Sequence, residues 1–142
     1  GVLNTCYNCV DRHVVTDEGR NRVAIIHDSP VTETLRNVTY GELHEEVLRL
    51  TKVMKYTYNL SKGDRVIIYM PNIPEAVISM LVCARLGVIH SVVFGGFAAN
   101  ELAIRINDCQ PKLIIAASCG IDGSKILDYK ELVIKFYNIY HH

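Results

Sequence analysis

At 142 residues, with 49% hydrophobic and 21% charged side chains, the chain has the length and composition of one folded globular domain. Its 15 Lys and Arg residues balance 15 Asp and Glu residues, so no overall charge favours nucleic acid or an anionic membrane. The apolar runs are all far shorter than the roughly 20 residues of a transmembrane helix. We therefore expect no nucleic-acid partner and no membrane partner.

The N-terminus and the cysteines bear on the cellular compartment. The chain begins at Gly1 and lacks the basic and apolar regions of a secretory signal, which indicates a cut or processed end. An odd number of five cysteines is typical of reduced thiols inside a cell and not of a disulfide framework. Cys6 and Cys9 have C-x-x-C spacing, but zinc would need about four ligands, and we interpret the pair as two small buried helix residues.

Two elements are predicted before the first long helix. Apolar positions three and four residues apart predict a helix over Leu3–Val14, and the run Arg22–Ile26 predicts a strand, with a second short strand ending near Val38. Thr39 and Glu42 then have the spacing of a capping box, which predicts a long helix from Thr39 onward. The buried stripe of this helix comprises Leu43, Val47, Leu50 and Met54.

The middle of the chain alternates strands with helices. Apolar runs predict strands at Arg65–Met70, Val88–Phe94 and Lys112–Ala117, and the first is apolar enough to be covered on both faces. The helix between the first two strands begins near Pro74 and ends at Gly87. The next helix is expected to bury Ala99, Leu102, Ala103 and Ile106.

A C-terminal helix is predicted to follow Asp128, which caps it together with Glu131, and to turn Leu132, Val133 and Phe136 inward. The order of strands and helices, joined by short connections, implies parallel pairing. We therefore predict an α/β fold: a partial doubly wound sheet with mainly parallel strands and helices on both faces.

Parallel strands end at one edge of a sheet, and that edge holds the ligand in open α/β folds. The segments PNIP (71–74), GGFA (95–98) and SCGIDGSK (118–125) are therefore predicted to line one crevice. Gly95 and Gly96 lack the third glycine of a dinucleotide fingerprint and serve either a turn and close approach or a phosphate cradle. Glu101 competes with an anion for the free N–H groups of the helix that follows. The loop Gly120–Lys125 is the better anion candidate, with a solvated surface turn as the alternative.

Three stretches of the chain carry a resemblance to a known family. They are DRHV, the long stretch YMPNIPEAVISMLVCARLGVIHSVVFGGFAANELAIRINDCQPKLIIAAS, and GIDGSKILDY. Together they resemble the N-terminal part of the AMP-forming short-chain acyl-CoA synthetases, the acetyl- and propionyl-CoA synthetase group. The similarity runs from about Asn4 to Leu132 and covers the first portion of a much longer protein.

The resemblance implies an activity. Members of the family join a short-chain carboxylate such as acetate or propionate to AMP, using ATP and magnesium, and then transfer the acyl group to the thiol of coenzyme A. In the family the nucleotide of coenzyme A lies against two segments of the protein. The resemblance matches them to Phe94, Gly95 and Gly96, and to Asp122, Gly123, Ser124 and Lys125 of this chain. Where many members carry arginines in the second segment this chain has Asp122 and Lys125, so bidentate phosphate recognition is lost.

The resemblance also implies what residues 1–142 lack. The family's Ser/Thr/Gly-rich ATP loop, its magnesium ligands and its C-terminal domain with the adenylation lysine have no counterpart here. We therefore expect a partial N-terminal domain that is inactive alone, has no catalytic residue or metal ligand, and is liable to self-associate through an unpaired sheet edge. The expected location is the mitochondrial matrix or the cytoplasm. Two alternatives stay open: a non-catalytic binding or interaction module, and a generic Rossmann-type nucleotide binder.

Overall fold

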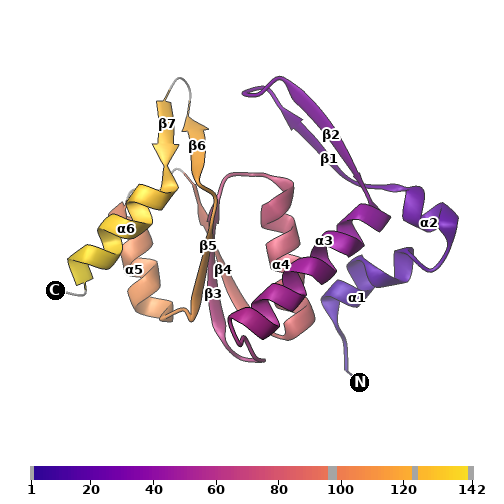
Figure 1. Ribbon diagram of the computed structural model, residues 1–142, viewed down its shortest axis with the longest axis horizontal. Helices are drawn as coiled ribbons and strands as arrows, with labels where there is room; N and C mark the ends of the chain where they lie inside the picture. Colours follow the sequence, from indigo (N-terminus) through magenta and orange to yellow (C-terminus); the bar gives the residue numbers. More distant parts are fainter. Residues whose placement is uncertain (1, 96–98, 123–124, 141–142) are drawn as a thin grey trace.

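A parallel sheet with helices on both faces forms the centre of the molecule, as the computed structural model shows (Figure 1). The structure describes residues 2–95, 99–122 and 125–140. The sheet consists of β3 (Arg65–Met70), β4 (Ile89–Phe94) and β5 (Leu113–Ala116), in the order β4-β3-β5. Both pairings of β3 are parallel, which confirms the predicted α/β class.

Strand β3 is central because its side chains are apolar on both faces of the sheet. Val66, Ile68 and Met70 pack into one hydrophobic cluster, whereas Ile67 and Tyr69 pack into a second cluster on the opposite face. This alternation follows from the two-residue period of a strand. The bounds of β3 are those predicted from the sequence.

One face of the sheet is covered by α3 (Tyr40–Lys52) and α4 (Pro74–Leu86), with α1 (Thr5–Cys9) packed against α4. The predicted capping box is present, since the N–H of Glu42 donates to the Thr39 hydroxyl at 3.2 Å and the Glu42 carboxylate accepts from the Thr39 N–H at 2.8 Å. Helix α3 continues into a π-helical turn, η2 (Val53–Thr57), and its predicted stripe packs inward. Helix α4 starts at Pro74 and ends at Gly87, whose φ of 69° is the left-handed conformation that a C-terminal glycine adopts readily.

The other face is covered by α5 (Ala99–Cys109) and α6 (Tyr129–Tyr140). Leu102 and Ala103 are buried, as predicted. The Asp128 carboxylate accepts a hydrogen bond of 2.9 Å from the N–H of Glu131, which confirms the predicted cap of α6. Leu132 and Val133 pack inward, whereas the side chain of Phe136 lies outside the described residues.

The predicted lead helix over Leu3–Val14 is wrong in its extent. Helix α1 ends at Cys9 because Val10 leaves the helical conformation (φ −129°, ψ −65°), and the 3₁₀ turn η1 (Asp11–His13) follows. The segment expected to be only a turn contains the short helix α2 (Asp17–Asn21), capped by Thr16. Cys6 is buried, but Cys9 is exposed, so the prediction of two buried cysteines holds only for Cys6.

Two antiparallel hairpins complete the fold, and both extend beyond the same edge of the sheet (Figure 1). The first is β1 (Val23–Ser29) with β2 (Thr34–Thr39), close to the predicted strands. The second is β6 (Cys119–Asp122) with β7 (Lys125–Asp128), where a loop was predicted. That prediction was wrong because cross-strand pairing, which no local pattern announces, orders these two four-residue strands. No helix among the described residues is long and apolar enough to cross a membrane.

Candidate functional site

The carboxyl ends of the parallel strands meet at one edge, as the sequence predicted. Met70, the last residue of β3, is in register with Phe94, the last residue of β4, and Ala116 of β5 is in register with Tyr69. The segments that follow these three strands therefore leave the sheet on the same side. This edge is where open α/β sheets bind their ligands.

The seven residues predicted to contact coenzyme A divide into two groups. Phe94 ends β4, Gly95 follows it and is buried, Asp122 ends β6 and Lys125 begins β7. Asp122 and Lys125 face each other in the hairpin register, and Lys125 is exposed. Gly96, Gly123 and Ser124 lie outside the described residues, as do the side chains of Phe94 and Asp122.

A residue that the sequence reasoning missed, Tyr129, joins the two predicted segments. A Cβ added to Gly95 would collide with the Tyr129 hydroxyl and lie 2.8 Å from its Cζ. A Cβ added to Gly120, in β6, would collide with the same hydroxyl and lie 2.7 Å from the same Cζ. Real Cβ atoms essentially never come within 3.0 Å of another atom, so the tip of Tyr129 occupies the space that both glycines leave open.

This arrangement agrees with the first of the two roles considered for Gly95, a turn and close approach. The close approach on the side of its missing Cβ is to protein, since a Cβ there would also lie 3.3 Å from the backbone N of Pro71. Gly95 therefore allows Tyr129 and Pro71 to pack closely at the carboxyl edge of the sheet. No local signal identifies Tyr129, because it lies 34 positions from Gly95 and its role depends on tertiary packing.

The phenol ring of Tyr129 is held firmly. It is 3% exposed, and its centroid lies 4.8 Å from that of Tyr69 at an interplanar angle of 49°. Tilted aromatic pairs at this separation are favourable. The backbone N–H of Tyr129 donates to the carbonyl of Ser118 at 3.1 Å. Burial also raises the pKa of Tyr69 above its ordinary value.

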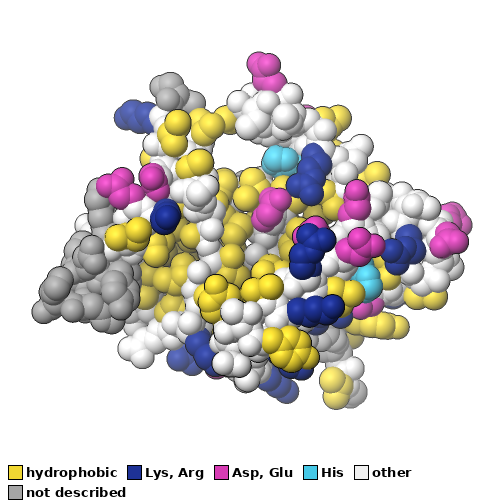
Figure 2. Space-filling view, in the orientation of Figure 1, with side chains coloured by type: hydrophobic (Ala, Val, Ile, Leu, Met, Phe, Trp, Pro, Cys, Tyr) yellow, Lys and Arg dark blue, Asp and Glu magenta, His cyan; other side chains and the backbone are white. Residues whose placement is uncertain are grey.

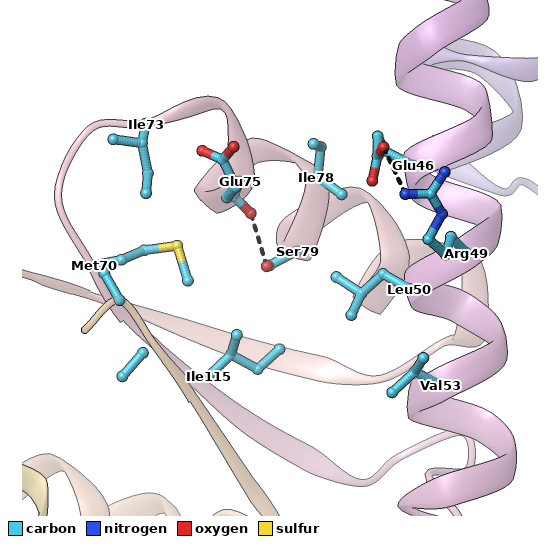
Figure 3. Close-up of a pocket in the computed structure, with 12 residues that line it drawn as sticks. Glu46, Arg49, Leu50, Val53, Met70, Ile73, Glu75, Ile78, Ser79 and Ile115 are labelled. Carbon is cyan, nitrogen blue, oxygen red and sulfur yellow. Dashed lines mark hydrogen bonds and ion pairs between the residues drawn. The ribbon is translucent and has the colours of Figure 1, made fainter. Parts of the chain in front are cut away.

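A largely apolar cavity of about 400 Å³ lies between α3, α4 and the end of β5 (Figure 3). Leu50 and Val53 line it from α3, and Ile115 lines it from β5. Its polar groups already have protein partners: Arg49 pairs with Glu46 at 3.2 Å, and the Ser79 hydroxyl donates to the Glu75 carbonyl at 2.8 Å. The cavity contains none of the residues predicted to contact coenzyme A.

Two further hollows border the two faces of β5. One of about 290 Å³ includes Met54 and Tyr58, and one of about 410 Å³ includes Lys130 and Val133. Hydrophobic side chains gather on the surface over β5, between the two helical layers (Figure 2). Within the described part of the chain β5 pairs only with β3, so its outer edge has unpaired backbone groups.

The predicted PNIP segment lines a separate hollow of about 330 Å³. Pro71 and Ile73 form one side of it, and Ile25 and His27 of β1 form the other. The segment therefore borders the carboxyl edge of the sheet with β1 as its neighbour, and this hollow includes no described residue of the other two segments predicted to share its crevice. Among residues 2–95, 99–122 and 125–140, no group of three or more His, Cys, Asp or Glu side chains is arranged to hold a metal ion.

Comparisons with known proteins agree with the fold. Residues 12–137 match the family of AMP-binding enzymes. The chain is 50% identical over 133 residues to acyl-CoA synthetase short-chain family member 3, mitochondrial, of Bos taurus, which covers 94% of this chain and 19% of that protein. It is 51% identical over 130 residues to acetyl-coenzyme A synthetase of Bradyrhizobium diazoefficiens, covering 92% of this chain and 20% of that protein.

A solved structure supports the same assignment. Acetoacetyl-CoA synthetase from Streptomyces lividans superposes with a TM-score of 0.85 at 25% identity, over 96% of this chain and 20% of that chain. The chain thus spans about a fifth of the length of the relatives it matches. The chain belongs to the AMP-binding enzyme family, and its relatives by sequence include proteins named short-chain acyl-CoA synthetase and acetyl-coenzyme A synthetase.

Proposed function

We propose that residues 1–142 form a partial N-terminal domain of a short-chain acyl-CoA synthetase and supply part of its coenzyme A site. The observation that carries this proposal is the 50% identity to an acyl-CoA synthetase along 94% of the chain. In such an enzyme a carboxylate such as acetate or propionate reacts with ATP in the presence of magnesium to give an acyl-adenylate and pyrophosphate, and the thiol of coenzyme A then takes the acyl group and displaces AMP. We infer an intracellular location, in the mitochondrial matrix or the cytoplasm.

The geometry of the carboxyl edge supports a coenzyme A site. Tyr129 packs against both Gly95 and Gly120, so the end of β4 and the hairpin β6–β7 are neighbours. Lys125 is exposed on that hairpin and presents an ammonium group suited to a phosphate. The residue paired with Lys125 in the hairpin register is Asp122, not a second cation. A single lysine predicts weaker binding of phosphate than a pair of arginines would give.

We expect no adenylation by residues 1–142 alone. They contain no Ser/Thr/Gly-rich loop for ATP phosphates, and nothing among them is proposed as a catalytic residue or magnesium ligand. The binding of ATP and magnesium is therefore assigned to other parts of the longer relatives. By itself, the chain is proposed to bind coenzyme A without catalysing adenylation.

Thermal unfolding of the 142-residue protein with coenzyme A, ATP or NAD tests the proposal. A ligand that binds only the folded state raises the unfolding temperature. We expect coenzyme A to raise it, and we expect no detectable ATP–pyrophosphate exchange. Protection by ATP or NAD without protection by coenzyme A would favour a generic nucleotide-binding module, and no protection at all would favour an interaction module. Robust pyrophosphate exchange would contradict the partial-domain proposal.

We also propose that the isolated chain self-associates through the edge of β5. The unpaired backbone groups of β5 and the apolar hollows on both of its faces support this proposal. A second copy of the chain would form hydrogen bonds with the backbone groups and fill the hollows. The balance of 15 basic and 15 acidic residues supplies no net repulsion between copies.

A further inference from the structure

Tyr129 contacts two segments that are far apart in the sequence and that both belong to the proposed coenzyme A site. Gly95 directly follows Phe94, and Gly120 lies two positions before Asp122. The phenol tip fills the space of the missing side chain at both glycines. A single buried side chain therefore spans the distance between the two segments.

The ring has little freedom to move aside. The Tyr69 ring packs against it in a tilted pair, with 4.8 Å between the ring centroids, and the backbone N–H of Tyr129 donates to the carbonyl of Ser118, just before the hairpin. The next N–H along, that of Lys130, donates to the same Ser118 carbonyl at 3.3 Å. Both the ring and the backbone of Tyr129 are thus held in place. The position of its hydroxyl therefore sets how closely the backbones at Gly95 and Gly120 can approach it.

We propose that Tyr129 is a positioning residue for the coenzyme A site: it holds the β4 end and the β6 strand at a fixed separation, so the site exists before ligand binds. This inference rests on the proposed function. A preformed site binds more tightly because the ligand does not have to order the protein. Tyr129 itself is 3% exposed and acts through the backbone at Gly95 and Gly120, not as a ligand.

The test measures two independent properties of the 142-residue protein. The first is amide hydrogen exchange at residues 93–95 and 119–122, which reports how firmly the two segments are held whether or not coenzyme A binds. The second is the dissociation constant for coenzyme A from calorimetry. For Tyr129→Leu we expect faster exchange in both segments and about tenfold weaker coenzyme A binding, and for Tyr129→Phe, which keeps the ring, about twofold.

Tyr40→Leu is the control, because Tyr40, at the start of α3 in the other helical layer, also packs in an aromatic pair, with its ring centroid 4.6 Å from that of His13. It should lower stability without changing coenzyme A affinity. Exchange that stays slow in either segment of Tyr129→Leu would overturn the proposal. So would an affinity loss no greater than that of Tyr40→Leu.

A double-mutant cycle keeps the proposal testable if Tyr129→Leu folds poorly. Gly120→Ala alone should strongly lower the unfolding temperature, and Gly120→Ala with Tyr129→Leu should recover part of that loss, because the colliding ring is gone. Simple additivity of the two changes would overturn the contact on which the inference stands. If the unmodified chain fails to bind coenzyme A, the proposed function falls, whereas exchange and the cycle still decide whether Tyr129 holds the two segments together.

Discussion

The carboxylate of Asp11 accepts a hydrogen bond from the guanidinium of Arg85, 74 residues further along the chain. Both side chains are about one-fifth exposed. Nearby, the Asn4 amide donates to the carbonyls of Ala84 and Arg85 at 3.3 and 3.2 Å. Polar contacts therefore fasten the N-terminal segment to the end of α4, beside the buried Cys6.

Asp11→Ala is expected to destabilise the protein by about 1–3 kcal/mol, because it leaves a largely buried guanidinium without its anionic partner. Arg36→Ala is the control, since the Arg36–Glu75 pair is more than half exposed on both sides and should contribute less than about 0.5 kcal/mol. Urea unfolding of the two variants measures the difference. Equal effects would show that the Asp11–Arg85 pair contributes no more to stability than an exposed ion pair does.

The thiols should differ in reactivity under native conditions. Burial raises the pKa of Cys83 to about 11, whereas Cys9 and Cys119 are exposed. Since the thiolate is the reactive form, Cys83 carries on the order of 100-fold less thiolate at pH 8 than an ordinary cysteine does. Iodoacetamide followed by peptide mass spectrometry should label Cys9 and Cys119 rapidly and Cys83 only after unfolding. Fast labelling of Cys83 in the folded protein would mean that α4 opens readily.

Acid should weaken the contact between Lys112 and Asp64. The ammonium of Lys112 donates to the Asp64 carboxylate at 2.9 Å, and this bond, followed by one from the Ser61 N–H, holds the pKa of Asp64 below its usual value. A carboxylate with a lowered folded-state pKa stabilises the fold above its unfolded pKa, and loses that contribution as pH falls through the folded value, here below about pH 4. Stability measured at pH 6 and at pH 3 should therefore fall less in Asp64→Asn than in the unmodified protein. A fall in Asp64→Asn as large as that in the unmodified protein would contradict this contribution of Asp64.

Local signals in the sequence were strong where one residue type dictates one conformation. The Thr39–Glu42 box, the Pro74 start and Gly87 end of α4, and the apolar run of β3 all appear in the structure as predicted. Each depends on neighbours within a few positions, so periodicity and capping rules suffice.

The candidate site was less predictable because long-range packing builds it. The hairpin at Cys119–Asp128 contains two short strands that only cross-strand pairing orders, and its sequence reads equally well as a turn. The role of Gly95 depends on Tyr129, which comes from a later helix. The alternation of strands and helices in the sequence could locate the carboxyl edge of the sheet. It could not identify Tyr129, the side chain that packs between Gly95 and Gly120 at that edge.

Lys125→Glu should weaken coenzyme A binding by about tenfold, because it replaces the exposed cation of the hairpin with a charge that repels phosphate. Lys52→Glu, an equally charge-reversing change at an exposed position on α3, is the control and should change affinity little. Calorimetry at two salt concentrations measures both, and the difference should shrink at high salt as the charges are screened. In a longer enzyme containing this segment, Lys125→Glu should impair use of coenzyme A more than use of ATP, and equal impairment would indicate a role in folding only.

Ala116→Lys should reduce self-association of the isolated chain. Ala116 is exposed at the end of β5 and borders the hollows on both faces of that strand, so a lysine there introduces charge and bulk at the edge where a second copy would pair. Thr32→Lys, in the exposed turn of the β1–β2 hairpin, adds the same charge away from the edge and should leave association unchanged. Light scattering coupled to gel filtration, over a range of protein concentrations, compares the three proteins. Because both variants raise the net charge by one, a decrease in both would point to general electrostatic repulsion, whereas a decrease in Ala116→Lys alone identifies the β5 edge as the interface.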